Sequence, residues 1–259
     1  MNAAKHPIND FSVYFDEANH KYMVDVEKNP EYWEEIPSVT QFIKHYTPPF
    51  DENKVSAIVA KKKGKTQAEI LAEWARKRDY ACEMGTRIHA NQEKTMKGQI
   101  DYLPPQNDRE RAIMYNGYQA IQDMKAAGFV PLEAEKMVFS MALKLAGTID
   151  AIFVKNRVMW LVDWKTNEKI DRTNEYHNFM LPPAETLDDC AFVHYKLQLN
   201  LYERILKTDG YIPKIQTVKK MLVHLKPHEY EIINVDDEPI ADKLLLDYMQ
   251  NDWFHLTPF

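Results

Sequence analysis

The chain has 259 residues, with 33 basic and 39 acidic side chains and a net charge of −6. Hydrophobic residues make up 45% and charged residues 28%, which excludes a disordered or collagen-like chain. Seven glycines and two cysteines argue against glycine-rich nucleotide loops, a disulfide framework and a four-cysteine cluster. No apolar run reaches the roughly 18 residues that span a bilayer, and the polar first ten residues lack the apolar segment of a secretion signal. We therefore expect a cytoplasmic protein without a membrane partner.

The first 127 residues predict a β-hairpin followed by helices. Apolar and polar residues alternate over residues 11–15 and again over 22–26, beyond a polar turn at residues 16–20, which predicts the hairpin. Ser38 with Gln41 forms a capping box that predicts a helix ended by Pro48 and Pro49. Three further helices are predicted over residues 66–78, 80–97 and 108–127, the first from a capping box of Thr66 with Glu69, and the last ended by Gly128.

The pattern changes to strands after Gly128. Three short β-rich runs cover residues 130–139, 143–154 and 157–165, and the last carries apolar residues on both faces, as a buried central strand does. Residues 166–187 show no periodicity, which indicates a functional or mobile loop. A helix over 188–207, strands over 215–225 and 229–235 and a helix over 238–250 follow. The order βββ-α-ββ-α predicts an α/β (α+β) fold.

Two apparent motifs carry no function in this interpretation. Gly64, Lys65 and Thr66 match the end of a phosphate-binding loop, but Val59 stands where its first glycine is required. His224 and His228 are four residues apart with Pro227 between them, in a segment that reads as a strand. We therefore do not interpret the first match as a phosphate-binding loop, and we interpret His224 and His228 as ordinary surface histidines.

Asp150, Asp163 and Lys165 form the most informative group. Asp150 lies in the second β-rich run, and Asp163 and Lys165 end the third, where they share one face of the strand. If the two strands form a hairpin, both carboxylates meet at one place. Two carboxylates on apolar strands are costly to bury unless a cation lies between them, and their oxygens suit Mg²⁺ or Mn²⁺. A structural Asp–Lys pair is the alternative.

Two helical groups accompany these strands. Gly85 and His89 are four residues apart on the predicted helix 80–97. Gln198 and Tyr202 share a face of the helix 188–207, also four residues apart. Taken alone, His89 is equally explained as an ordinary helix histidine, and the other pair as part of an amphipathic surface.

The ordered set G-x-x-x-H, G-x-x-D, D-x-K and Q-x-x-x-Y resembles the RecB-like branch of the PD-(D/E)XK nucleases. It covers about residues 83–205: Gly85 to His89, Gly147 to Asp150, Asp163 to Lys165 and Gln198 to Tyr202. The N-terminal hairpin followed by residues 36–40 also resembles phage and mitochondrial exonucleases of this branch. Glu135 stands where many relatives have an acidic residue on the first core strand.

The resemblance implies one nuclease domain over residues 1–259, with an N-terminal hairpin and helical part at 1–79 and an αβββαβ restriction-endonuclease-like core at 80–259. It implies metal-dependent cleavage of DNA, most simply by an exonuclease of recombination, repair or replication. It also implies one or two Mg²⁺ or Mn²⁺ ions and, since only two cysteines are present, no iron–sulfur cluster. The implied metal ligands are His89, Asp150, Asp163 and the Trp164 carbonyl; Lys165, Gln198, Tyr202 and Glu135 complete the implied catalytic set.

DNA is the expected partner, and a recombination or single-strand-binding protein is a candidate second one. The basic side chains expected to line the strand path are Lys61, Lys62, Lys63, Lys65, Arg76, Arg78 and Arg87. A bacterial or phage-infected cytoplasm is the expected location, with an organellar matrix as the alternative. A double-strand-specific recombination exonuclease, an endonuclease of the same fold and a non-catalytic DNA-binding module remain as alternative functions.

Overall fold

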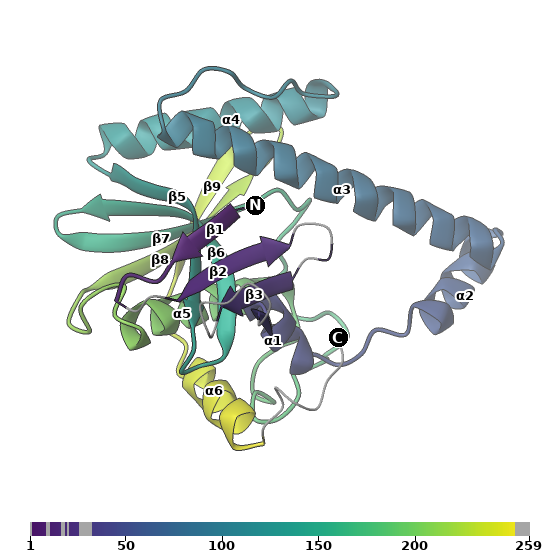
Figure 1. Cartoon of the computed structure of the whole chain (residues 1–259). Coiled ribbons are helices and arrows are strands. Elements are labelled where there is room, and N and C mark those ends of the chain that lie inside the picture. Colours follow the sequence, from purple (N-terminus) through teal and green to yellow (C-terminus); the bar gives the residue numbers. More distant parts are fainter. Residues whose placement is uncertain (1, 9–10, 17–18, 20, 26–32, 252–259) are drawn as a thin grey trace.

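The computed structural model describes residues 2–8, 11–16, 19, 21–25 and 33–251 (Figure 1). In this part of the chain, six helices accompany a four-stranded antiparallel sheet and a five-stranded mixed sheet. The expected mixed α/β class is confirmed. The described residues include no helix long and apolar enough to cross a membrane.

The N-terminal sheet has the strand order β1-β2-β3-β4, and all neighbouring strands are antiparallel. Its strands are β1 (Asn2–Lys5), β2 (Ser12–Asp16), β3 (Lys21–Asp25) and β4 (Trp33–Ile36). The predicted hairpin is confirmed as β2 and β3, although Val26 and most of its turn lie outside the described residues. Sequence reasoning missed β1 and β4, since each has only four residues.

Helices α1 (Val39–His45), α2 (Glu52–Lys63), α3 (Gln67–Met96) and α4 (Asp108–Ala126) follow. The capping boxes at Ser38 and Thr66 are confirmed at the start of α1 and α3. The prediction of two helices over 66–97 is wrong, because α3 runs unbroken for 30 residues and crosses the expected boundary at residue 79. No proline or glycine stands near that boundary, so nothing there ends the helix. Helix α2 was missed, and Asn107 rather than Asp108 caps α4.

The central sheet has the order β5-β6-β7-β8-β9. Its strands β5 (Val130–Ser140), β6 (Leu145–Lys155), β7 (Val158–Lys165), β8 (Val218–Leu225) and β9 (Tyr230–Val235) lie where the sequence predicts them. Only β7 and β8 are parallel, and α5 (Ala191–Thr208) makes the crossover between them. Helix α6 (Ile240–Gln250) follows β9.

Helices cover both faces of the central sheet (Figure 1). On one face, α1, α5 and α6 share a core that includes Phe42, Leu197 and Leu244. On the other face, α3 and α4 pack through Ile88 and Ile113 against strand residues of β6, β7 and β8. The sheet is therefore fixed from both sides, which holds the middle of β6 and the end of β7 in place.

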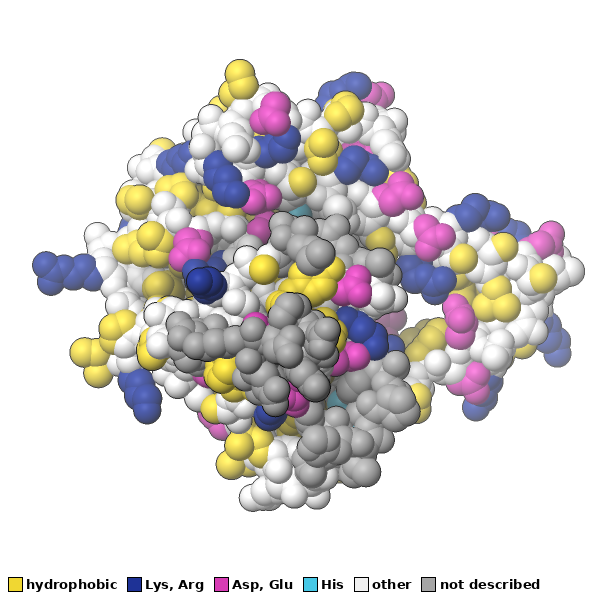
Figure 2. Space-filling model, in the orientation of Figure 1, with side chains coloured by type: hydrophobic (Ala, Val, Ile, Leu, Met, Phe, Trp, Pro, Cys, Tyr) yellow, Lys and Arg dark blue, Asp and Glu magenta, His cyan; other side chains and the backbone are white. Residues whose placement is uncertain are grey.

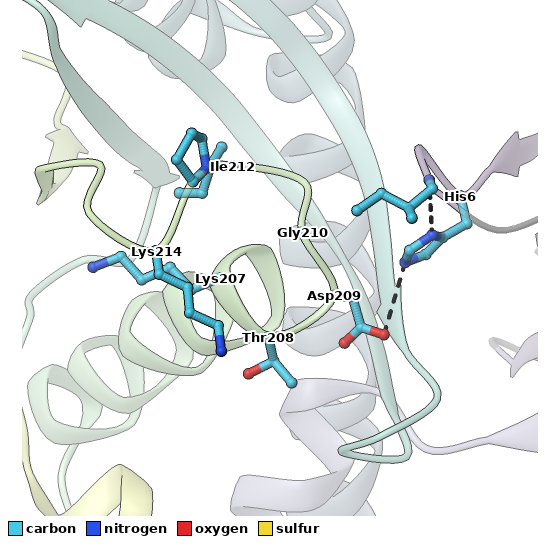
Figure 3. A pocket seen from close by; sticks show the side chains of 9 residues that line it. His6, Lys207, Thr208, Asp209, Gly210, Ile212 and Lys214 are labelled. Carbon is cyan, nitrogen blue, oxygen red and sulfur yellow. Dashed lines mark hydrogen bonds and ion pairs between the residues drawn. The ribbon is translucent and has the colours of Figure 1, made fainter.

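A buried histidine connects the N-terminal segment to the end of α5 (Figure 3). The ring of His6 points toward Asp209, with 3.7 Å between Nε2 and Oδ1. Its edge contacts the rings of Phe139 and Tyr211. A cavity of about 560 Å³ lies beside this pair and is lined by none of the sequence-predicted site residues. This contact is thus part of how the N-terminal sheet is held in place.

Candidate metal and catalytic site

The two strand aspartates lie where β6 and β7 separate. The register of this antiparallel pair ends at Ala151 and Val162. Asp150 and Asp163 come one residue further on each strand, which places their side chains on the same face. Beyond the last pair, the backbone N–H of Trp164 donates to Asp150 Oδ2 at 2.9 Å. Asp150 therefore satisfies a backbone donor that the sheet no longer pairs, and this fixes its carboxylate.

His89 and Glu135 join Asp150 in a compact cluster. Nδ1 of His89, on α3, lies 3.6 Å from Glu135 Oε1 and 3.6 Å from Asp150 Oδ2. One ligand atom from each of the three residues lies within 4.8 Å of the others. On the other side of the ring, Nε2–H donates to the Trp164 carbonyl at 3.2 Å. That hydrogen bond leaves Nδ1 as the nitrogen available to a cation, an arrangement common among metal-binding histidines.

Glu135 has a strained backbone. Its φ is +48° in the interior of β5, in the left-handed region that non-glycine residues rarely adopt. Its neighbours Ala134 and Lys136 pair with Ala151 and Ile149, so Glu135 stands across from Asp150. Such strain costs of the order of 1–3 kcal/mol and concentrates at functional sites. The local conformation therefore brings this carboxylate to the cluster at an energetic cost.

Lys165 pairs with Asp163 next to the cluster. Lys165 Nζ lies 2.7 Å from Asp163 Oδ2, and the two side chains are 16% and 3% exposed. Asp163 lies outside the three-residue cluster in the described geometry, since its carboxylate is engaged by Lys165. The sequence-predicted residues are thus divided between a cluster of His89, Glu135 and Asp150 and an adjoining ion pair.

Burial and mutual charge shift the pKa values of this group. Burial raises the pKa of Asp163 to about 6, although Lys165 opposes the shift, and burial also raises the pKa of Asp150. For His89, burial lowers the pKa, but Asp150 and Glu135 raise it to about 9. The carboxylates therefore favour positive charge at His89, as they would favour a cation.

Sequence reasoning missed Tyr195, which contacts Lys165. The Lys165 ammonium lies 4.2 Å from the centre of the Tyr195 ring, and the Tyr195 hydroxyl donates to Asn167 Oδ1 at 2.9 Å. The available signal was its position one turn before Gln198 on α5, which places it on the same helix face.

The expectation that His224 is a surface histidine is wrong. It is 3% exposed, and its Nε2–H donates to the Asn167 carbonyl at 2.7 Å. The parallel pairing of β8 with β7 buries this side chain beside the segment that follows Lys165. His224 therefore fixes Asn167, which in turn holds Tyr195. His228 is exposed, as expected.

Replacing Tyr195 with leucine should slow a reaction that depends on Lys165 by roughly 2- to 30-fold, the value of a partly buried cation–π contact. Tyr195→Phe keeps the ring and loses only the hydrogen bond to Asn167, so it should retain most of the rate. Single-turnover rates of such a reaction in both variants measure the difference. Equal losses in both would contradict a positioning role of the ring.

Gln198 and Tyr202 are buried beneath β6. Gln198 Nε2 donates to the Tyr202 hydroxyl at 3.2 Å, and the two residues are 9% and 4% exposed. The Tyr202 ring lies directly against Gly147, where an added Cβ would be 2.6 Å from Tyr202 Cε1. In the described contacts, Lys165 is engaged by Asp163 and Tyr195 rather than by Gln198 or Tyr202. Gln198 and Tyr202 instead support the strand that carries Asp150.

The close approach of Tyr202 predicts a large effect of one methyl group. Gly147→Ala should destabilise the protein by about 1–3 kcal/mol, because the ring and the strand cannot both keep their positions. Urea denaturation measures this free energy. Gly85→Ala is the control, because an added Cβ there meets nothing within 4 Å and, as at Gly147, the backbone is not left-handed. A Gly147→Ala variant as stable as wild type would contradict the contact.

A cleft of about 1000 Å³ opens beside His89 and Glu135. Three parts of the fold form it: the N-terminal sheet, the exposed face of α3, and β5 with β6. Its lining residues include Phe15, Tyr22, Gly85, Thr148 and Met137. The cluster is therefore accessible from one side of the molecule.

The basic residues predicted to line a strand path belong mainly to α2 and α3, which project from the molecule as an arm (Figure 1). The arm consists of α2 and the first half of α3, a helix about 45 Å long. The exposed residues there are Lys61, Lys62, Lys63, Lys65, Arg76 and Arg78. Acidic side chains lie among them (Figure 2), and Glu73 pairs with Lys65 at 3.0 Å. Arg87 is different, since it pairs at 2.6 Å with the fully buried Glu110.

Comparisons with known proteins do not assign a family. No protein-family profile matches the chain, and no curated protein does. The crystal structure of SSO0001 matches with a TM-score of 0.29 at 13% identity, over 64% of this chain and 84% of that one. A TM-score this low supports no inference about fold or function.

Proposed function

We propose that the chain is a metal-dependent deoxyribonuclease with a PD-(D/E)XK core of the RecB-like type, most simply an exonuclease. One observation carries the proposal: His89, Glu135 and Asp150 gather within 4.8 Å beside a buried Asp163–Lys165 pair. The element order α4-β5-β6-β7-α5-β8 agrees with the αβββαβ core that the resemblance implies. Structural ion pairs also perturb pKa values, but they do not require strained backbone at an acidic residue.

The donor set fits a hard divalent cation. Two carboxylates and one imidazole face one another, and Asp163 lies next to them on the adjoining strand. Carboxylate oxygens suit Mg²⁺, and a set that includes an imidazole suits Mn²⁺ as well. His89, Asp150 and Glu135 would hold the ion, and the Asp163–Lys165 pair would lie beside it. The Trp164 carbonyl would orient His89.

The surrounding residues provide the rest of the chemistry of phosphodiester hydrolysis. A divalent ion, when bound, activates water and neutralises phosphate charge. Lys165, held by Asp163 and the Tyr195 ring, places a positive charge where negative charge develops on the phosphate. Glu135 and Asp150 keep His89 oriented. Gln198 and Tyr202 act through their support of β6 rather than through contact with a phosphate.

DNA is the proposed substrate, with the arm of α2 and α3 as its electrostatic guide. The exposed lysines and arginines of the arm can contact a DNA backbone that leads to the cluster. A net charge of −6 does not oppose this, because local basic patches act within an acidic chain. A recombination or single-strand-binding protein is the partner we propose, in a bacterial or phage-infected cytoplasm.

Digestion of end-labelled linear DNA and internally labelled circular DNA tests the proposed function. Linear single-stranded, blunt double-stranded and closed circular DNA are incubated with Mg²⁺ or Mn²⁺, and with EDTA as control. Metal-dependent loss of linear DNA with circles left intact supports an exonuclease. Cleavage of circles would instead indicate an endonuclease, and cleavage of duplex alone a double-strand-specific exonuclease. Tight DNA binding without cleavage of any substrate would contradict the proposal and favour a non-catalytic module.

A further inference from the structure

The cleft beside the cluster has one aromatic wall. Phe15 and Tyr22 face each other across β2 and β3, with ring centres 4.7 Å apart. Both line the cleft, and Met137 of β5 extends the apolar surface. The Tyr22 hydroxyl is hydrogen-bonded to Thr148 Oγ1 at 2.9 Å, which fixes this ring against the central sheet. The N-terminal sheet therefore offers the cleft a rigid apolar surface.

The opposite wall is a helix face kept open by glycine. Gly85 lies inside α3, one turn before His89 and on the same face. A Cβ added to Gly85 would meet nothing within 4 Å, so no contact within the protein requires glycine here. Glycine in a helix interior is less favourable than alanine by about 0.5–1 kcal/mol. The open space at Gly85 is thus maintained at some expense in stability.

The charges around the cleft do not suit a phosphate chain running through it. Of the described residues that line it, Lys97 and His89 are the basic ones. Lys97 Nζ is paired with Glu93 Oε1 at 2.5 Å, and His89 faces Glu135 and Asp150. Two lining glutamates, Glu93 and Glu135, would repel a second phosphate. The cleft therefore suits an uncharged, flat group attached to a phosphate that lies at the cluster.

We propose that this cleft is a subsite for one unpaired nucleobase, stacked on Phe15 and passing close to the helix backbone at Gly85. The inference rests on the proposed nuclease function and specifies its substrate as a strand with at least one unpaired nucleotide at the cluster. A volume of about 1000 Å³ is at the upper end of what small-ligand sites enclose. It accommodates a nucleotide, whereas a base held in a duplex must first unpair to enter.

An abasic scan tests the subsite with the unmodified protein. Short single-stranded oligonucleotides, each lacking one base at a different position, are titrated in Ca²⁺, which takes oxygen ligands at longer distances than Mg²⁺. Fluorescence anisotropy gives each dissociation constant. We expect a roughly tenfold loss of affinity at one or two adjacent positions, the value of one stacked base. Equal affinity at every position would overturn the subsite alone.

Two variants test whether the base whose removal weakens binding lies in the cleft. Phe15→Leu keeps an apolar side chain and removes the ring, so it should bind the intact strand about tenfold more weakly and no longer distinguish it from the abasic strand. Tyr14→Leu is the matched control, since Tyr14 lies on the other face of β2 against Trp33. Gly85→Met fills the cleft from the helix side and should have the same effect as Phe15→Leu.

The outcomes separate the two proposals. One outcome is that removal of one base weakens binding by Phe15→Leu and Gly85→Met as much as it weakens binding by wild type. In that case the base lies outside the cleft, and the proposed subsite is wrong. If wild type cleaves DNA but the scan is flat, the nuclease proposal stands and the subsite falls. If wild type binds no strand in Ca²⁺ and cleaves none in Mg²⁺, both proposals fall.

Discussion

Methionine in place of Lys165 is expected to slow metal-dependent DNA cleavage by roughly 10²- to 10³-fold, as the loss of one preorganised charge at a reacting phosphate does. The variant keeps an unbranched apolar side chain that is one atom shorter, while the charge that lies 4.2 Å from the centre of the Tyr195 ring and 2.7 Å from Asp163 is lost. The measurement is the single-turnover rate on end-labelled single-stranded DNA at saturating Mg²⁺.

Lys169→Met is the matched control for this loss. Lys169 follows Lys165 by four residues, but it is 66% exposed and pairs with Asp171 and Glu175 instead of a strand carboxylate. It should cleave at a rate close to that of wild type. Circular dichroism of both variants verifies folding. A folded Lys165→Met protein with full activity would show that the Asp163–Lys165 pair is only structural.

Mn²⁺ should raise the melting temperature of the wild-type protein by about 5–10 °C at a hundredfold excess over its dissociation constant. An ion bound only by the folded state stabilises it by about 2.7 kcal/mol under this condition. Asp150→Asn should remove most of this rise in melting temperature, because the substitution removes a negatively charged ligand from the cluster with His89 and Glu135. Differential scanning fluorimetry with and without Mn²⁺ measures the effect.

The Mn²⁺-induced rise in melting temperature should increase with pH. Burial raises the pKa of Asp163 to about 6, and the carboxylates raise that of His89 to about 9 in spite of its burial. Protons therefore compete with the ion for these groups, and the Mn²⁺-induced shift should be smaller at pH 6 than at pH 9. Glu231→Gln, on β9, is the control and should keep the wild-type response. A pH-independent shift, or one unchanged in Asp150→Asn, would place the ion elsewhere.

The residues that the sequence placed at the site are those that local patterns determine. Asp150, Asp163 and Lys165 follow from strand periodicity, and the register of β6 with β7 brings them to one place. Glu135 was placed at the site by the family resemblance alone, because it reaches the cluster through a left-handed backbone inside β5 that no periodicity predicts. His224 and Tyr195 join through Asn167, in the segment without periodicity. Their roles depend on the parallel pairing of β8 with β7 and on the packing of α5, which are tertiary contacts that local sequence patterns do not predict.

In the helical half too, local features were predicted correctly and features that lack a local signal were missed. Capping boxes located the starts of α1 and α3 correctly, because the side-chain hydrogen bonds that form them are local. The continuity of α3 through Asp79 was missed, although no breaker stands there. Strand β1 was missed because four residues carry too little pattern, and its pairing with β2 completes the sheet whose Phe15 and Tyr22 line the cleft.

We propose the cluster of His89, Glu135 and Asp150, where β6 and β7 separate, as the centre of a metal-dependent nuclease. The most direct measurement is the rate of DNA cleavage against Mn²⁺ concentration for wild type and Asp163→Asn in the same titration. We predict a saturable rise from zero in EDTA for wild type and a loss of at least roughly a hundredfold in the variant. Cleavage that persists in EDTA, or a variant with the wild-type curve, would contradict the assignment.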